Sequence, residues 1–128
     1  MNRVVLDASA LGAMVFGEPE GDRLFDRLRG ATVHAPALLR FELMSIAWKK
    51  VRRQPDDALA ILTALRIALD ESTGIEWCDV NSTDVVLVAQ ATQLTVYDAT
   101  YLWLAGSLGA DLVTLDRRLA EAGAAVTV

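Results

Sequence analysis

Hydrophobic residues follow two patterns along the chain, and these patterns alternate. Short, mainly apolar segments predict strands at residues 4–6, 32–35, 75–78 and 112–115, and the unbroken run at 4–6 is typical of a buried parallel strand. Between them apolar residues recur every three or four positions, which predicts helices at 10–16, 20–28, 37–53, 55–69, 84–93, 95 to Gly106 or Gly109, and 117–122. Residues 125–128 are a candidate fifth strand. This alternation implies an α/β fold with helices on both faces of a parallel or mostly parallel sheet.

Polar residues predict where several of these helices begin. Ser9 is expected to cap the helix at 10–16, and Asn81 or Ser82 the helix at 84–93. Gln54-Pro55-Asp56-Asp57 interrupts a long helical segment, and its proline and two acids suit a new helix start. Residues 37–69 therefore predict a helical hairpin. Thr95 and Asp98 fit a capping box at the start of the next helix.

The composition is that of a globular protein of one domain, residues 1–128. The 53% hydrophobic and 23% charged residues are suited to a packed core, and the length suits one domain. A single cysteine, Cys78, excludes an internal disulfide and a cysteine-based zinc cluster and fits a reducing cytoplasm. Asp7 interrupts the only apolar stretch near the N-terminus, so no signal peptide is expected. No apolar run approaches the length of a membrane span.

Positive charge is unevenly distributed in a chain whose net charge is -5. This net charge argues against a protein that holds nucleic acid by bulk electrostatics. Basic residues nevertheless gather in one segment and again directly after Asp116: Arg40, Lys49, Lys50, Arg52, Arg53, Arg117 and Arg118. Two interpretations stay open, namely a solvated helix face and a local strip that contacts phosphates.

Four acidic residues lie in apolar sequence, where an ionised carboxylate is unfavourable unless its charge is compensated: Asp7, Glu42, Asp98 and Asp116. Asp7 and Asp116 follow predicted strands, at the edge of the sheet where ligand sites of α/β proteins form. Glu42 has mainly apolar neighbours three and four positions away, so it lies near the buried stripe of its helix. Each acid also has a structural interpretation: a loop or helix-capping role for Asp7 and Asp116, an arginine salt bridge for Glu42, and the capping box for Asp98.

If these acids converge, they form a site for a hard cation. Oxygen ligands suit Mg²⁺ or Mn²⁺ rather than Zn²⁺, and a single histidine, His34, excludes a histidine-rich zinc site. No Gly-x-Ser-x-Gly elbow, Walker loop or GxGxxG motif is present. Ser9 and Thr114 each lie two residues from one of the aspartates, and their hydroxyls can serve a metal, its water or a phosphate.

The segments that carry these acids resemble the PIN-domain ribonucleases, and more closely the VapC-type toxins of bacterial toxin–antitoxin pairs. They are Val4-Val5-Leu6-Asp7-Ala8-Ser9-Ala10-Leu11, Phe41-Glu42-Leu43, Tyr97-Asp98-Ala99-Thr100-Tyr101-Leu102 and Leu112-Val113-Thr114-Leu115-Asp116. The resemblance spans essentially the whole chain, with the motifs in the family's order. It places Asp7, Glu42, Asp98 and Asp116 at the family's acidic quartet and Ser9 and Thr114 at its accessory hydroxyl positions.

This resemblance implies a three-layer α/β/α sandwich around a mostly parallel sheet of four or five strands. It also implies Mg²⁺-dependent cleavage of RNA, a homodimer, and inhibition by a small antitoxin protein. The expected function is hydrolysis of RNA phosphodiester bonds in the cytoplasm. Asp7, Asp98 and Asp116 would hold one or two Mg²⁺ ions, and Glu42 would bind a metal or orient its water. Candidates for RNA phosphate contacts are Arg40, Arg117 and Arg118.

Two other functions remain open from the sequence. One is a non-catalytic module that binds RNA or an antitoxin, because ligand residues alone do not demonstrate turnover. The other is an aspartate-based phosphotransfer protein, since Asp7 also follows a first strand. Such proteins usually need a lysine near the aspartate, whereas Lys49 and Lys50 lie together on the long predicted helix.

Overall fold

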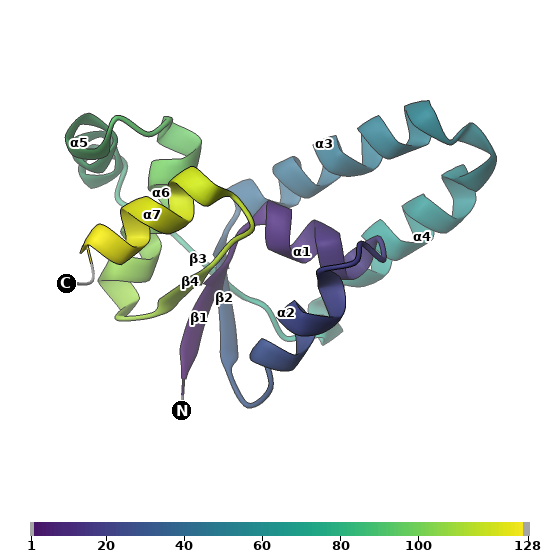
Figure 1. Cartoon of the computed structure of the whole chain (residues 1–128), viewed down its shortest axis with the longest axis horizontal. Coiled ribbons are helices and arrows are strands. Elements are labelled where there is room, and N and C mark those ends of the chain that lie inside the picture. Colours follow the sequence, from purple (N-terminus) through teal and green to yellow (C-terminus); the bar gives the residue numbers. More distant parts are fainter. Residues whose placement is uncertain (1, 127–128) are drawn as a thin grey trace.

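Four parallel strands form the centre of the molecule in a computed structural model that describes residues 2–126 (Figure 1). They are β1 (Arg3–Leu6), β2 (Thr32–Pro36), β3 (Glu76–Cys78) and β4 (Asp111–Val113), in the spatial order β3-β2-β1-β4. Val4 lies beside Val33 of β2, and Val5 lies beside Leu112 of β4. All four predicted strands are therefore present, with ends shifted by one or two residues.

In the described part of the chain, seven helices cover the sheet from both sides. They are α1 (Ala8–Val15), α2 (Gly21–Arg27), α3 (Leu38–Arg53), α4 (Ala58–Ala68), α5 (Ser82–Thr92), α6 (Val96–Leu108) and α7 (Arg117–Val126), with short 3-10 segments at Pro55–Asp57 and Glu71–Thr73. Figure 1 shows α1 to α4 on one side of the strands and α5 to α7 on the other. The predicted three-layer α/β/α architecture is confirmed, and α3 and α4 form the predicted hairpin. Within residues 2–126, no helix is both long and apolar enough to cross a membrane.

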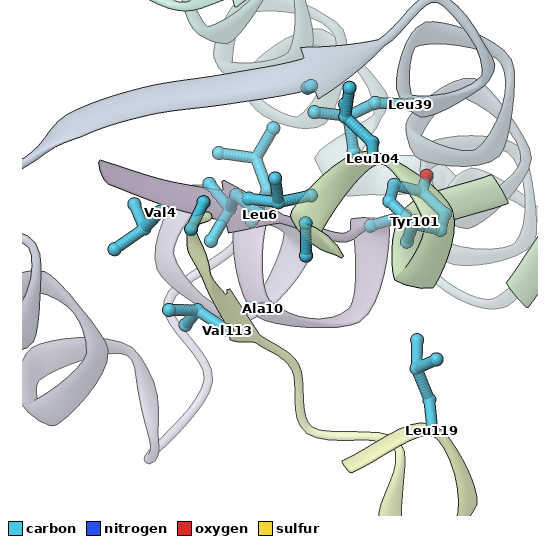
Figure 2. Close-up of a cluster of buried hydrophobic side chains, with 14 of the residues drawn as sticks. Val4, Leu6, Ala10, Leu39, Tyr101, Leu104, Val113 and Leu119 are labelled. Atoms are coloured by element: carbon cyan, nitrogen blue, oxygen red, sulfur yellow. The ribbon is translucent and has the colours of Figure 1, made fainter. Parts of the chain in front are cut away.

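The core is built around β1, whose apolar run packs on both faces. Val4, Val5 and Leu6 are buried, as expected for a strand with neighbours on either side. Figure 2 shows side chains from separate elements gathered around β1, among them Ala10 of α1, Leu39 of α3, Leu104 of α6 and Val113 of β4. Tyr101 is buried in this cluster with its hydroxyl oxygen at one edge. Asp7 directly follows this buried strand, so it lies at the carboxyl end of the central part of the sheet.

Two expectations about helix ends are wrong. Asp7, not Ser9, caps α1: its carboxylate accepts a hydrogen bond from the Ala10 N–H, and Ser9 lies inside the helix. The predicted fifth strand is also incorrect for residues 125 and 126, which belong to α7, while residues 127–128 lie outside the described part. The helix runs on past the predicted end, and its Leu119 is buried in the core.

Candidate functional site

All four predicted acids line one hollow of about 260 Å³ beside the carboxyl ends of β1 and β4. Asp7 directly follows β1, Glu42 lies on α3, Asp98 lies in the first turn of α6, and Asp116 directly precedes α7. The remaining lining residues are Ala8, Ser9, Ser45, Ile46, Lys49 and Tyr101. Four separate segments thus bring their carboxylates to one place, as the edge of a parallel sheet allows.

Asp7 is the most buried of the four and is held on both carboxylate oxygens. It is 5% exposed. Its Oδ1 accepts hydrogen bonds from the Ser9 hydroxyl at 2.7 Å and from the Ala10 N–H at 3.0 Å. Its Oδ2 accepts a short hydrogen bond from the Thr114 hydroxyl. The side chain is therefore fixed in one orientation before any ligand binds.

The same two hydroxyls connect Asp7 to the loop between β4 and α7. The Leu115 N–H donates to the Ser9 hydroxyl oxygen, and the Asp116 N–H donates to the Thr114 hydroxyl oxygen, each at 2.9 Å. Ser9 and Thr114 each donate to Asp7 and accept from this loop, so they hold Asp7 and Asp116 near each other. Their expected direct role toward a metal or phosphate stays a prediction; the structure shows them positioning the two aspartates.

Glu42 is half-buried and has Tyr101 as its partner. The Tyr101 side chain is 1% exposed, and its hydroxyl donates to Glu42 Oε1 at 2.5 Å, which links α6 to α3. In the described part of the chain, no ion pair between Glu42 and an arginine is found. The salt-bridge interpretation of Glu42 is therefore wrong, and the carboxylate is instead held by a phenol.

Asp98 and Asp116 combine a place in the hollow with a role at a helix start. The Asp98 N–H donates to the Thr95 hydroxyl at 3.1 Å, so Thr95 caps α6 as expected. Asp116 Oδ1 accepts from the Leu119 N–H at 3.0 Å and caps α7. Asp116 is exposed, contrary to the expectation from its apolar context, because it lies on the loop beyond the buried strand. At Asp116 the carboxylate both caps a helix and lines the hollow, whereas at Asp98 the backbone N–H takes part in the cap and the side chain lines the hollow.

Burial and mutual repulsion shift the protonation equilibria of the site. The pKa values of Asp7, Glu42 and Asp98 are all raised, first because burial disfavours the charged form. Neighbouring carboxylates raise them further: Asp116 acts on Asp7 and Asp98, while Asp98 and Asp7 act on Glu42. Hydrogen bonds from Thr114 and Tyr101 oppose these shifts at Asp7 and Glu42. A bound cation would relieve this repulsion.

The donor set fits Mg²⁺ or Mn²⁺, because it consists of carboxylate oxygens with hydroxyls nearby. Within residues 2–126, however, no group of three acidic, histidine or cysteine side chains forms a ready-made metal cage. Mg²⁺ usually keeps several water ligands and is bound through only one or two carboxylates, so a preformed cage is not required. The site therefore fits a hydrated divalent cation better than a fully dehydrated one.

The sequence did not place Tyr101 or Lys49 at the acidic site, although Lys49 belongs to the basic segment for which a phosphate-contacting role was left open. Tyr101 lies three residues after Asp98 on α6, and Lys49 lies two helical turns after Glu42 on α3, so helical spacing was the available signal. Lys49 lines the same hollow as the aspartates. Its position contradicts one argument against a phosphotransfer protein, namely that both lysines lie away from the aspartates.

None of the three predicted RNA-contacting arginines lines the acidic hollow. The Arg40 guanidinium lies 3.9 Å from the centre of the Trp77 ring. Arg117 pairs with Glu121 at 3.3 Å, and Arg118 donates to the Gln93 carbonyl at 2.9 Å. The positive charge of Arg118 nevertheless acts on Asp98 and opposes part of the rise in its pKa, which burial causes first. Contacts of these arginines with RNA stay a prediction.

Comparison with known proteins gives consistent matches. Residues 4–125 match the family model of the PIN domain. Ribonuclease VapC3 of Pyrobaculum aerophilum is 32% identical over 123 residues, covering 93% of each chain. Ribonuclease VapC12 of Mycobacterium tuberculosis is 33% identical over 122 residues, covering 92% of this chain and 90% of that protein.

Two solved structures share the fold. PAE2754 from Pyrobaculum aerophilum superimposes with a TM-score of 0.75 at 26% identity, over 94% of this chain and 84% of that one. VapC20 of Mycobacterium tuberculosis, described as a sarcin–ricin loop cleaving toxin, superimposes with a TM-score of 0.66 at 18% identity, over 94% and 95%. The second likeness supports the fold alone. From the family match over nearly the whole chain and the two relatives above 30% identity, we conclude that this chain belongs to the PIN-domain family and is similar to the VapC ribonucleases.

Proposed function

We propose that the chain is a Mg²⁺-dependent endoribonuclease that hydrolyses RNA phosphodiester bonds in the cytoplasm, as the toxin of a toxin–antitoxin pair. The observation that carries the proposal is the convergence of Asp7, Glu42, Asp98 and Asp116 on one hollow at the strand ends. The substrate class comes from the relatives that are named ribonucleases. Family membership favours this function over aspartate-based phosphotransfer, despite the position of Lys49.

Asp7, Asp98 and Asp116 would hold one or two Mg²⁺ ions, and Glu42 would bind a metal or orient its water. When bound, Mg²⁺ would acidify the attacking water and neutralise charge on the phosphate. The protein's own contribution is positioning. Ser9 and Thr114 fix Asp7, and Tyr101 fixes Glu42, so both carboxylates are oriented in advance.

The proposal is tested by incubating the purified protein with structured RNAs in Mg²⁺ and, separately, in excess chelator. Attack by water, without participation of the RNA 2′-hydroxyl, leaves a 5′-phosphate and a 3′-hydroxyl. We therefore expect Mg²⁺-dependent fragments that an exonuclease specific for 5′-phosphates can degrade. Fragments with a 2′,3′-cyclic phosphate, or cleavage that persists in chelator, would contradict metal-assisted hydrolysis. No cleavage of any RNA would favour the non-catalytic alternative.

Tyr101→Phe should weaken Mg²⁺ binding several-fold and lower the cleavage rate roughly tenfold. Phenylalanine keeps the ring in the core but removes the donor that holds Glu42 Oε1. Loss of one such hydrogen bond should change the free energy of unfolding by only about 1 kcal/mol. Calorimetric titration with Mg²⁺ provides a readout separate from activity. The matched control is Tyr97→Phe, an exposed phenol on the same helix. Equal Mg²⁺ affinities in both variants would exclude a positioning role for Tyr101.

The antitoxin and a second copy of the chain are the protein partners of this proposal. Large apolar side chains on the α3–α4 hairpin are exposed, including Phe41, Leu59 and Leu62, and exposed apolar surface favours a protein interface. A short upstream reading frame that encodes a DNA-binding protein would support the toxin role. Absence of such a frame would weaken the toxin role and leave the nuclease activity unaffected.

A further inference from the structure

We propose that Lys49, Arg52 and Arg53 form a phosphate-binding subsite that holds the RNA backbone next to the acidic hollow. This inference rests on the proposed ribonuclease function and identifies where the substrate approaches. The three residues lie in the last turns of α3. They surround a second hollow of about 380 Å³.

Lys49 connects the two hollows. It lines the acidic hollow together with Asp7 and Glu42, and it also lines the basic one together with Arg52 and Arg53. Arg52 and Arg53 follow Lys49 by three and four residues, which places them about 4.5 and 6 Å further along the helix and on the same face. An RNA strand whose cleaved phosphate lies over the acids can therefore place a neighbouring phosphate over the basic hollow.

The other two basic residues of α3 already have protein partners. Lys50 pairs with Glu18 at 2.5 Å, and Arg40 stacks on Trp77. In the part of the chain that the structure describes, neither Lys49 nor Arg53 takes part in an ion pair. The charges of the basic hollow are thus available to a ligand.

The charge distribution explains why such a subsite is needed. The net charge is -5, and four carboxylates line the hollow where the scissile phosphate must lie. A polyanion is repelled there unless cations lie within a Debye length, about 10 Å at 0.1 M salt. Arginine suits this task because its planar guanidinium can donate two parallel hydrogen bonds to a phosphate. Local positive charge thus offsets the overall negative charge of the chain.

An exposed aromatic ring next to the hollow favours RNA over an acidic protein as the ligand. Trp48 is 60% exposed, and the Arg52 guanidinium lies 5.6 Å from the centre of its ring. Aromatic rings beside basic residues are typical of surfaces that bind single-stranded nucleic acid, because bases stack on the ring while phosphates contact the cations. Arg52 and Trp48 together offer both contacts.

The test compares the double variant Arg52→Gln/Arg53→Gln with a charge-matched control, Arg23→Gln/Arg29→Gln. The control arginines are exposed, on or just after α2, and line neither hollow. Lys49 is left intact because its place in both hollows would mix binding with catalysis. Cleavage kinetics and the binding of a labelled single-stranded RNA at several salt concentrations are measured. Mg²⁺ binding and thermal stability are measured alongside.

For the Arg52/Arg53 variant we expect KM to rise roughly tenfold with kcat and Mg²⁺ affinity nearly unchanged. The slope of log K against log salt should fall by about 1.4, because two phosphate contacts are lost. If the wild type cleaves RNA but the Arg52/Arg53 variant has the same KM and salt slope as the control variant, the phosphate-binding subsite is contradicted and the proposed function is not. A wild type that neither cleaves nor binds RNA would overturn the proposed function as well.

Discussion

Asp7→Asn should lower the rate of Mg²⁺-dependent RNA cleavage on the order of 10³-fold, equivalent to about 4 kcal/mol of transition-state stabilisation. Asparagine has nearly the same shape but lacks the negative charge that would hold the cation. The surrounding hydrogen bonds can adapt, since an amide can accept from Ser9 and Ala10 and donate toward Thr114. We therefore expect the loss of activity without loss of the fold.

Stability distinguishes this loss from unfolding. Burial raises the pKa of Asp7, which means that the charged form of this carboxyl is less favourable in the folded protein than in water. The neutral variant should unfold at the same temperature as wild type without metal, or higher. Asp22→Asn is the matched control, because it removes the same charge from an exposed position in the first turn of α2. An Asp7→Asn protein that cleaves RNA at more than a tenth of the wild-type rate would contradict the assigned role.

Adding Mg²⁺ should raise the unfolding temperature of the wild type and do so more strongly at pH 7.5 than at pH 5. A ligand present at a hundredfold excess over its Kd stabilises the folded state by about 2.7 kcal/mol, or roughly 5–15 °C for a chain of this size. The effect depends on pH because the carboxylates must be ionised to bind the metal, and the pKa values of Asp7, Glu42 and Asp98 are raised.

Without metal, the contribution of these carboxylates to the stability of the protein should fall as pH rises. Because these three pKa values are higher in the folded chain than in the unfolded one, the folded chain binds more protons between the ordinary carboxyl pKa and the raised values. The contribution of these groups to stability is therefore present below that window and lost as pH rises through it. Differential scanning calorimetry of wild type and Asp7→Asn should show the variant's advantage growing from acid to neutral pH. Mg²⁺ shifts of equal size in the two proteins would contradict a metal site at Asp7.

Three of the four acids lie at helix N-termini, which suggests how the site tolerates them without a cation. Asp7 caps α1, Asp116 caps α7, and Asp98 is in the first turn of α6. The N-terminus of a helix carries a partial positive charge and unpaired N–H groups, both of which stabilise a nearby carboxylate. Glu42, in the middle of α3, depends instead on Tyr101. The fold thus stabilises the separate carboxylates, and the remaining repulsion between them favours binding of a cation.

The sequence by itself determined the layered α/β fold and the edge of the sheet at which Asp7 and Asp116 lie. Strand and helix positions follow from local periodicity, and parallel strands joined by helices have their carboxyl ends at one edge. Asp7 and Asp116 were therefore expected at the same edge of the sheet, since each follows a strand; the tertiary structure then places β1 and β4 next to each other. The apolar neighbours of Glu42 likewise predicted a helix face directed toward the core.

Only the tertiary structure decided which partners hold these acids. The Tyr101 hydroxyl meets Glu42 across 59 residues of chain, and Thr114 meets Asp7 across 107. Contacts between distant parts of the chain also decide three other features. Asp7 rather than Ser9 caps α1, Asp116 is exposed, and Lys49 lies between the two hollows. Periodicity describes which face of an element is buried. The distance between two side chains depends on how whole elements pack, because packing fixes the position and angle of one helix relative to another.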